Sequence, residues 1–309
     1  MPELPEVETV RRGLNQTTRH QTITGGDVLL ERTIAHPLFV NEFLDGLRGK
    51  AIARWHRRGK YLLAELERQT EAQDGSQEDL EHPRGWDGRV GKHGYLGVHL
   101  RMTGQFLWVD QAEPLQKHTR VRLFFEQDAQ GDRSNSRELR FVDQRTFGQM
   151  WWVPPGVAPE TVITGLSRLG PEALSEEFSV QHFQQCLAKS HRPIKNALLD
   201  QALVAGIGNI YADEALFISG IRPQTLASTL RPSQVVRLHA AIVAVLKEAI
   251  AANGTTFSDF KTVYGINGNY GHHARVYDRE GQPCRVCGSP IERLKLAGRS
   301  AHFCCKCQH

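Results

Sequence analysis

The amino terminus of the chain places a proline beside two carboxylates. Pro2 follows Met1, and a small second residue usually lets that methionine be removed, which would leave a secondary amine. A terminal amine titrates at about 7.7–8.0, below lysine, so more of it is unprotonated near neutral pH. Such amines attack carbon electrophiles and form Schiff bases, and the nearby Glu3 and Glu6 can move protons. The alternative interpretation is an ordinary helix start, in which proline and first-turn acidic residues stabilise the helix.

Four of the six cysteines form two pairs near the carboxyl terminus. Cys284 and Cys287 are separated by two residues, and so are Cys304 and Cys307. This spacing is typical of a closed, tetrahedral zinc site of the structural kind. Cys305 lies beside Cys304, but only Cys304 gives the two-residue gap to Cys307. We therefore predict one structural Zn²⁺ held by these four cysteines.

Two further stretches carry basic residues that suit contact with a polyanion. Residues 54–61 hold four Lys or Arg side chains between two expected strands. This cluster is either a solvated hairpin tip or a set of phosphate contacts. The segment 290–303, between the cysteine pairs, is expected to form a β-hairpin with Arg299 at its tip. An arginine in that position can insert into a DNA groove.

Composition limits the class of protein. The 309 residues suggest about two domains, 40% of them are hydrophobic, and no run is long enough to span a membrane. The polar, acidic start is unlike a signal peptide, so we expect a cytoplasmic protein. Residues 191–309 contain 14 Lys or Arg against 8 Asp or Glu, a balance of +6, whereas residues 1–190 have 24 against 26, a balance of −2. A basic carboxyl-terminal part favours a polyanionic partner.

These residues need elements that hold them in place, and the first part of the chain predicts a β-sandwich with flanking helices. A helix is expected from about Pro5, because Val7, Val10 and Leu14 recur at helical spacing. Many short strand-like runs follow, punctuated by glycine, as in a sandwich. We place this domain at residues 1–153 and a linker rich in proline at 154–171. The runs lie at 23–30, 52–55, 61–66, 96–100, 106–109, 121–125, 139–142 and 151–153.

From residue 172 the pattern becomes helical, so the fold class is α+β. One helix is expected to run into the turn 205–208 and a second to start near Asn209, whose side chain would cap it. Backbone amides at such a helix start bind phosphate. Residues 232–252 have the spacing of an amphipathic helix. We place a helical domain at 172–275 and a zinc finger at 276–309.

The stretch Pro2-Glu-Leu-Pro-Glu-Val-Glu-Thr-Val-Arg-Arg-Gly-Leu resembles the start of the formamidopyrimidine-DNA glycosylases, the Fpg or MutM family. Arg-Gly-Lys-Tyr-Leu-Leu at 58–63 and Leu-Gly-Pro-Glu-Ala-Leu at 169–174 are similar to later motifs of that family. Residues 193–214 resemble its helix-two-turn-helix, and the cysteine pairs resemble its zinc finger. The resemblance implies a bacterial, nucleoid-associated monomer that removes oxidised purines from damaged double-stranded DNA.

The resemblance also implies catalytic roles. Pro2 would attack C1′ of the damaged nucleotide, Glu3 would assist base departure and opening of the sugar ring, and Glu6 would support the site. The resulting Schiff base would undergo β- and δ-elimination. Lys60 matches a lysine that binds phosphate and supports catalysis, and Arg299 matches an arginine that binds the phosphates flanking the lesion.

Further residues are implied to contact DNA. An enzyme that everts a base needs side chains to fill the hole that the base leaves. Met102, Arg145 and Phe147 match the three residues that do so in the family. The DNA-binding residues implied by the resemblance are His118, Arg145, Lys195, Asn209 and Arg299.

The chain departs from the family pattern in two places. Thr146 stands where a second basic residue is common, and residues 69–93 form an acidic insertion that we expect to point away from DNA. The insertion has no function that we can assign. A Gly/Asn/Tyr-rich loop at 262–272 corresponds to the loop that holds the everted base. That loop differs among family members, so no residue roles carry over.

Two other functions remain open. An endonuclease VIII-type enzyme shares the chemistry but prefers oxidised pyrimidines, and its start usually reads Pro-Glu-Gly-Pro-Glu, whereas Leu4 stands here. The other is a zinc-ribbon protein that binds DNA without catalysis. Such a protein would need none of Pro2, Glu3 and Lys60.

Overall fold

The structure is a computed structural model that describes residues 1–68, 86, 88–126, 136–255, 263, 265 and 268–309. The chain divides into two compact units. The first comprises Met1–Pro2, Glu6–Ser167 and Ser258–Gly268, and the second comprises Glu3–Pro5, Arg168–Phe257 and Asn269–His309. The domain limits at residues 153, 171 and 275 stay predictions.

Nine strands of the first unit form one hydrogen-bonded sheet, in the order β2-β9-β5-β4-β3-β1-β7-β8-β6. All neighbouring pairs are antiparallel except β2 with β9. Eight of the nine were expected from the sequence. The strands are β1 (Thr22–Val28), β2 (Ile34–His36), β3 (Lys50–Arg58), β4 (Tyr61–Arg68), β5 (Tyr95–His99), β6 (Gly104–Asp110), β7 (Thr119–Phe125), β8 (Arg137–Asp143) and β9 (Gln149–Val153).

The sheet folds over so that its two halves pack face to face. Trp55 on β3 and Phe106 on β6 meet edge to face at 5.9 Å between ring centroids, although three strands separate β3 from β6 in the sheet order. Leu62, Val98 and Leu139 are buried in the same cluster. Burial of these apolar faces stabilises the unit. The predicted sandwich is therefore present, built from one sheet.

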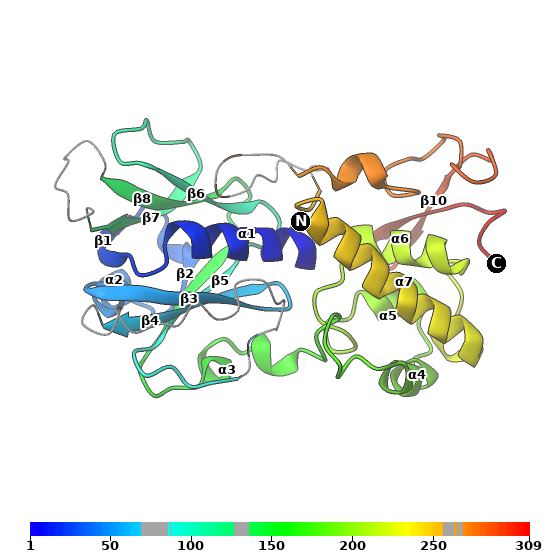
Figure 1. Ribbon diagram of the computed structural model, residues 1–309, viewed down its shortest axis with the longest axis horizontal. Coiled ribbons are helices and arrows are strands. Elements are labelled where there is room, and N and C mark those ends of the chain that lie inside the picture. The colour runs from blue at the N-terminus through cyan, green and yellow to red at the C-terminus, as the bar shows by residue number, and fades with distance from the viewer. Residues whose placement is uncertain (69–85, 87, 127–135, 256–262, 264, 266–267) are drawn as a thin grey trace. The chain divides into compact units, whose positions relative to one another are not determined.

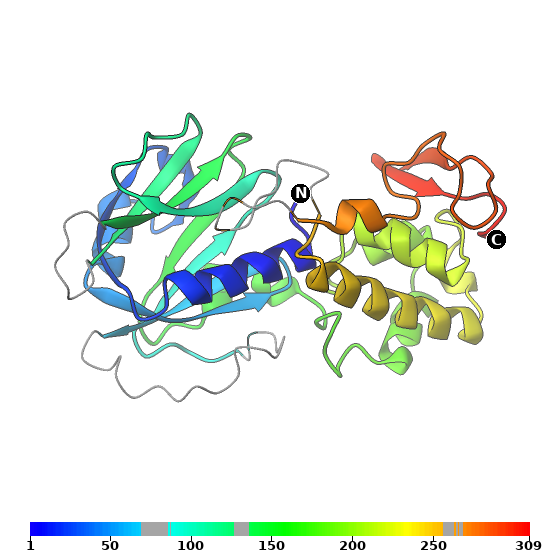
Figure 2. The same ribbon diagram turned by 45° about the horizontal axis from the view of Figure 1, so that its top comes forward.

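Helix α1 (Leu4–Thr17) runs along this sheet, with β1, β7, β8 and β6 on one side and β3 and β4 on the other (Figures 1 and 2). Val7, Val10 and Leu14 are fully buried in the sandwich core, as their spacing predicts. Helix α2 (Val40–Leu47) and strand β2 had no sequence prediction. They are only eight and three residues long, too short for a periodic pattern.

The second unit is mainly helical. Helix α7 carries the predicted amphipathic stripe, and Val235, Leu238, Ile242 and Val245 are all buried. They pack against α6, whose residues are mostly buried. The helices of the second unit are α4 (Val180–Ala188), α5 (Ile194–Leu198), α6 (Asn209–Ser219) and α7 (Pro232–Ala251), with 3₁₀ turns η5 (Ala227–Thr229) and η6 (Tyr270–His273). The first unit also contains η1 (Glu31–Thr33) and α3 (Pro159–Val162), and η4 (Leu166–Arg168) lies where the units meet in the sequence.

The prediction that a helix runs into the turn 205–208 is wrong, because α5 ends at Leu198. In the segment after it, a side chain bonds to the backbone of the turn. Gln201 accepts a hydrogen bond from the amide of Gly206 at 2.9 Å and donates to the carbonyl of Ile207 at 2.8 Å. Polar side chains that bond nearby backbone compete with the helix. The resulting turn delivers the chain to the start of α6.

A hairpin closes the second unit, as expected, with strands β10 (Glu292–Leu296) and β11 (Arg299–Phe303), drawn in red in Figure 2. Its two-residue turn consists of Ala297 and Gly298, and both have positive φ angles, 44° and 79°. Tight hairpin turns of this kind suit the twist of the strands.

Among the described residues, no helix combines the length and the apolar character that crossing a membrane requires.

Candidate functional site

Pro2, the candidate nucleophile, is buried in the first unit, just before α1. Met1 precedes it, so the Pro2 nitrogen is an amide nitrogen in this chain and becomes a secondary amine only when Met1 is removed. Glu6, in the first turn of α1, is 1% exposed. The first unit also holds Lys60 and the three expected hole-filling residues, whereas Glu3, Lys195, Asn209 and Arg299 belong to the second.

Glu3 lies at the start of α6 and takes the role expected of Asn209. One carboxylate oxygen accepts the amide hydrogen of Ile210 at 3.0 Å, and the other accepts that of Tyr211 at 3.5 Å. A Cβ at Gly208 would come within 2.2 Å of the Glu3 carboxyl carbon, so only glycine allows this approach. The prediction that Asn209 caps α6 is wrong, because Asn209 is the first residue of the helix and the Glu3 carboxylate bonds to its terminal amides. Phosphate binding near this helix start stays a prediction.

The basic stretch 54–61 is not a solvated hairpin tip. Arg57 is 1% exposed, and it donates to the carboxylate of Glu8 at 3.2 Å and to the carbonyl of Gly59 at 3.1 Å. Glu8 on α1 also accepts from Arg11 at 2.8 Å. These contacts tie the turn that carries Lys60 to the helix that follows Pro2. Arg57 is therefore a buried structural residue. It does not fit the interpretation that the whole cluster contacts phosphate.

Lys60 lies in the turn between β3 and β4, and it is 6% exposed. The charge of Lys60 affects the pKa of His99 on β5. Burial and, to a lesser degree, the positive charges of Arg101 and Lys60 together lower the pKa of His99 to about 3. His99 Nδ1 accepts a hydrogen bond from the Arg101 amide at 2.9 Å. Lys60 therefore has a neutral imidazole in its surroundings near neutral pH.

The three expected hole-filling residues lie on two loops of the first unit. Met102 precedes β6, and Arg145 and Phe147 lie between β8 and β9. Phe147 is 52% exposed, and the Arg145 guanidinium lies 5.0 Å from the centre of its ring. His118 lies beside this loop, because its carbonyl accepts the amide hydrogen of Asp143 at 2.9 Å. The structure thus brings these four predicted residues to one end of the sandwich.

Lys195 joins helices α5 and α6 to the hairpin of the second unit. Its side chain is fully buried, and Nζ donates to the Asp213 carboxylate at 2.6 Å and to the carbonyl of Ser300. Desolvation lowers the pKa of Lys195, while the Asp213 charge opposes that shift. The other Asp213 oxygen accepts the His302 amide hydrogen at 2.9 Å. Lys195 therefore has a structural role, and its contact with DNA stays a prediction.

Asn209 and Arg299 are the other predicted DNA-binding residues of the second unit. Asn209 is the first residue of α6, and its side chain hydrogen bonds to Tyr277. Its Oδ1 atom has no hydrogen-bond partner among the described residues. Arg299 is exposed at the start of β11, next to the hairpin turn. The Arg299 guanidinium can donate to a phosphate, whereas Asn209 Oδ1 is a buried acceptor, so the contact of Asn209 with DNA stays a prediction.

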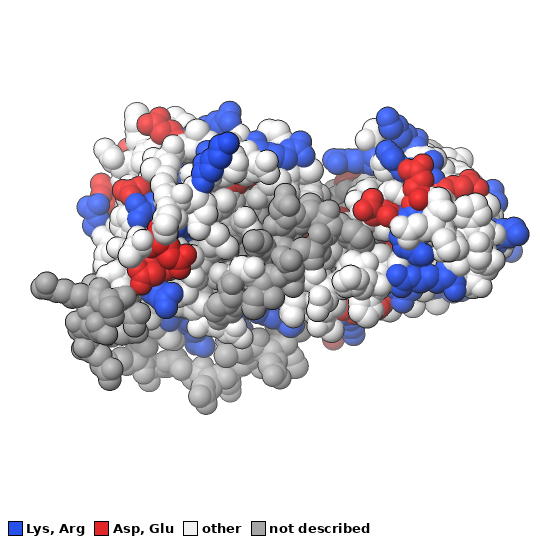
Figure 3. Space-filling model, turned by 90° about the horizontal axis from the view of Figure 1, so that it is seen from above, with Lys and Arg blue, Asp and Glu red and all other residues white. Residues whose placement is uncertain are grey.

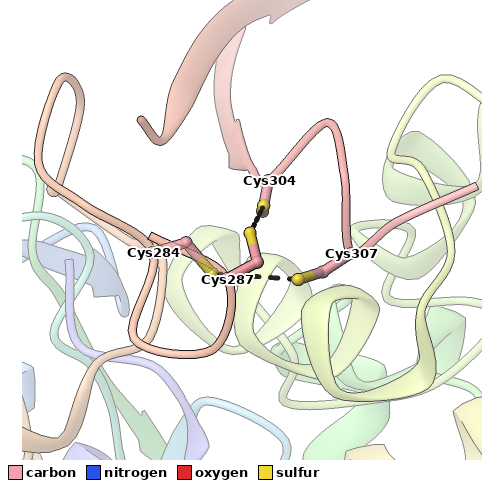
Figure 4. A group of neighbouring side chains, drawn as sticks. All are labelled: Cys284, Cys287, Cys304 and Cys307. Carbon is pink, nitrogen blue, oxygen red and sulfur yellow. Dashed lines mark hydrogen bonds between the residues drawn. The ribbon is translucent and has the colours of Figure 1, made fainter. Parts of the chain in front are cut away.

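The four predicted zinc ligands converge (Figure 4). Their sulfur atoms all lie within 4.8 Å of one another, with Cys287 and Cys304 at 3.4 Å and Cys284 and Cys307 at 3.9 Å. A tetrahedral ZnS₄ centre with bonds of about 2.3 Å has sulfur atoms about 3.8 Å apart. The donor set fits one structural Zn²⁺, and Cys305 lies outside the cluster.

Charge on one face of the molecule is mixed. On the face in Figure 3, Lys and Arg side chains are interspersed with Asp and Glu in both units. Favourable phosphate contacts would therefore depend on individual placed residues more than on one broad basic field. Most of the acidic insertion 69–93 lies outside the described residues, and so does part of the loop 262–272.

Sequence reasoning missed the buried charged residues that hold the site together. Glu8, Arg57, Asp143 and Asp213 are each no more than 1% exposed, and each bonds to a segment that carries a predicted site residue. Glu8 stood inside a recognised motif, so its position was a usable signal. Asp213 likewise lies within the stretch 193–214 that resembles a family motif, whereas Asp143 was marked only by its place two residues before Arg145.

Comparison with known proteins covers the whole chain. Residues 1–150 match the family model of the formamidopyrimidine-DNA glycosylase N-terminal domain, residues 169–261 match the H2TH domain of the same enzymes, and residues 281–309 match the zinc finger found in FPG and IleRS. Two relatives named formamidopyrimidine-DNA glycosylase, from Trichodesmium erythraeum and Nostoc punctiforme, are each 59% identical. The alignments cover 100% of this chain and 100% and 96% of those proteins.

Solved structures agree. The MutM (Fpg) protein from Thermus thermophilus is 38% identical to this chain, with a TM-score of 0.80. The match covers 99% of this chain and 98% of the Thermus thermophilus chain. The Lactococcus lactis Fpg in complex with DNA containing an abasic site is 31% identical with a TM-score of 0.82, over 99% of both chains. Because the matches run through the sandwich, the helical region and the cysteine cluster, this chain belongs to the formamidopyrimidine-DNA glycosylase family of enzymes.

Proposed function

We propose that this chain is a bifunctional DNA glycosylase and AP lyase that excises oxidised purines, namely 8-oxoguanine and formamidopyrimidines, during base excision repair. Full-length family membership carries this proposal, together with Pro2, Glu3 and Lys60 at the matching positions. Lactococcus lactis Fpg structures with Fapy-dG DNA and with abasic DNA support the substrate class. We further propose that it acts as a monomer at the nucleoid, in the cytoplasm of a bacterial cell.

The first chemical step joins the protein to the sugar. Once Met1 is removed, the lone pair of the Pro2 amine forms a bond to C1′ of the damaged nucleotide, and the glycosidic bond breaks with its electrons leaving on the base. Glu3 assists base departure and opening of the sugar ring by moving protons. Its carboxylate is held in place by the amides of Ile210 and Tyr211, which orients it before substrate arrives.

The second step breaks the strand. Loss of the C1′–O4′ bond gives a Schiff base between Pro2 and the sugar, and this cation makes the neighbouring hydrogen acidic. β- and then δ-elimination release the two phosphates and leave a gap of one nucleotide with phosphate ends. Lys60 and Arg299 hold backbone phosphates during these steps, with Lys195 and Asn209 beside the lesion. The zinc centre holds the hairpin that carries Arg299 and takes no part in the chemistry.

The substrate class is tested with two duplexes that differ in one nucleotide, 8-oxoguanine opposite cytosine or an oxidised pyrimidine opposite its partner. We expect base release and a one-nucleotide gap with phosphate ends on the first duplex, and much slower release on the second. Preference for the pyrimidine would instead support the endonuclease VIII-type activity. Tight binding to both duplexes without cleavage would support a non-catalytic zinc-ribbon protein.

A further inference from the structure

Two loops at one end of the sandwich present an exposed aromatic ring and an arginine together. Phe147 is 52% exposed, and the Arg145 guanidinium lies over its ring at 5.0 Å. Met102 lies on the neighbouring loop, one residue before Thr103. A large apolar ring exposed to water costs free energy unless it meets a partner. We call residues 101–103 and 144–148 the tip.

One buried carboxylate bonds to both loops of the tip. Asp143, the last residue of β8, is 1% exposed. Its Oδ1 accepts hydrogen bonds from the Thr103 hydroxyl and, at 3.2 Å, from the Arg145 amide. Its Oδ2 accepts from the Gly148 amide at 2.7 Å. Asp143 therefore spans the segment that contains Arg145 and Phe147, binding it at both ends.

Thr103 completes the clamp from the other loop. Its hydroxyl oxygen accepts the Arg145 amide hydrogen at 2.9 Å while the hydroxyl donates to Asp143. The loop that carries Met102 is thereby bonded to the loop that carries Arg145. Hydrogen bonds to a carboxylate are about twice as strong as those between neutral groups. The loops that carry Met102, Arg145 and Phe147 thus share one anchoring point.

The surrounding backbone leaves the tip little freedom. A Cβ at Gly148 would lie 2.4 Å from Cζ of Phe141, so the chain passes against the core there. Thr146 has a φ of 58°, in the left-handed region. The Asp143 carbonyl accepts from Arg120 at 2.9 Å, and its amide donates to the carbonyl of His118. Side chain and backbone of one residue therefore hold the base of the tip.

We propose that Asp143 and Thr103 are positioning residues that hold Met102, Arg145 and Phe147 ready for insertion into the DNA stack. This inference rests on the proposed function. A side chain that fills the space of an everted base must be ordered when it enters the duplex. If the tip is already ordered in the free protein, its side chains lose little conformational entropy when DNA binds, and this favours eversion of the base. The two residues touch no reacting atom and act through the three that they hold.

The test uses Thr103, which is only partly buried, so that its variants fold. Thr103→Val keeps the shape and removes the hydroxyl, whereas Thr103→Ser keeps the hydroxyl and is the matched control. Each is measured for single-turnover release of 8-oxoguanine from a duplex and for cleavage at an abasic site made beforehand. Eversion is hardest when an intact base is stacked and paired. We expect Thr103→Val to slow base release about tenfold, the loss expected when a hydrogen bond to a charged group is removed.

Cleavage at the abasic site should change less than about twofold in Thr103→Val, and Thr103→Ser should restore base release, because the hydroxyl is what the clamp needs. In a Phe147→Ala background, Thr103→Val should add little further loss, since residues that act through one another are not additive. Equal slowing on both substrates, or full additivity with Phe147→Ala, would overturn the inference. Wild-type protein that releases no base would contradict the proposed function, and the inference with it.

Discussion

Glu8 illustrates how one buried residue supports several others. It receives hydrogen bonds from Arg11, Arg12 and Arg57, and it is 1% exposed. Burial alone would raise the pKa of its carboxyl, but the hydrogen bond from Arg11 and the charges of Arg11, Arg57 and Arg12 outweigh that effect and lower the pKa to about 2. Since the three arginines come from α1 and β3, the carboxylate holds the helix after Pro2 against the sheet.

Replacement of this carboxylate should destabilise the first unit. A fall in pKa from 4.5 to about 2 corresponds to about 3 kcal/mol at neutral pH. We expect Glu8→Gln to lower the free energy of unfolding by about that amount at pH 7. A lowered carboxyl pKa stabilises the fold above the unfolded value and loses that effect as pH falls. The wild type should therefore lose this stability between about pH 4.5 and 2, and the variant should lack that part of the pH dependence.

Chemical denaturation across that pH range measures the effect. Glu42→Gln is the matched control, because Glu42 is an exposed carboxyl in α2 of the same unit. Exposed substitutions of this kind usually change stability by less than about 0.5 kcal/mol. Equal stability of the two variants at pH 7 would show that the Glu8 network contributes nothing to the fold.

At the residue scale, the sequence predicts best those side chains that stand inside contiguous motifs. The four cysteines were found because their spacing identifies them, and they do converge. Pro2 and Lys60 were singled out by their neighbours in the same way, and their roles stay predictions. The network of Glu8 was hidden because its partner Arg57 lies 49 residues away. The capping of α6 by Glu3 was hidden in the same way, since a separation of 207 residues carries no local signal.

At the scale of elements, length and periodicity decided what could be predicted. The 20-residue helix α7 and the alternating strand β7 were found because a buried stripe repeats along them. Helix α5 stops after five residues because Gln201 bonds to the turn that follows, and propensity cannot reveal such a contact. The strands and the sandwich could be predicted from the sequence, but their order in a single continuous sheet could not, because pairing between distant strands is a tertiary feature.

The zinc hairpin gives a prediction at this same scale. Cys304 lies in the cluster of four sulfurs, whereas the adjacent Cys305 does not. We expect Cys304→Ser to lose zinc and Cys305→Ser to retain one zinc per chain, because serine is a poor replacement for a thiolate ligand. Atomic absorption on the purified variants measures this. Zinc lost from Cys305→Ser but kept by Cys304→Ser would shift the register of the second pair by one residue.

At the scale of the whole molecule, the tryptophans and the zinc ligands lie in different units. All five tryptophans, at positions 55, 86, 108, 151 and 152, belong to the first unit, and the zinc ligands belong to the second. The core of the first unit contains no residue of the hairpin. Loss of zinc should therefore disturb only the second unit, because its small hairpin core depends on the metal.

Removal of zinc with a chelator tests this division. We expect the tryptophan emission to stay at its native wavelength while binding to the damaged duplex falls at least tenfold, since Arg299 loses its support. Added zinc should restore binding. A red shift of the tryptophan emission on chelation would contradict the independence of the first unit. Unchanged DNA binding without zinc would contradict the role assigned to the hairpin.

The central claim is that the nitrogen of Pro2 forms a covalent bond with the damaged nucleotide. Borohydride reduces a Schiff base to a stable amine, so it traps the protein on its substrate. The decisive measurement is borohydride trapping of wild type and Pro2→Gly on a duplex with one 8-oxoguanine opposite cytosine. The account predicts a covalent adduct with the wild type that maps to the first residue of the mature chain and is lost in the variant. No adduct with zinc-loaded wild type, or an equal adduct with Pro2→Gly, would contradict it.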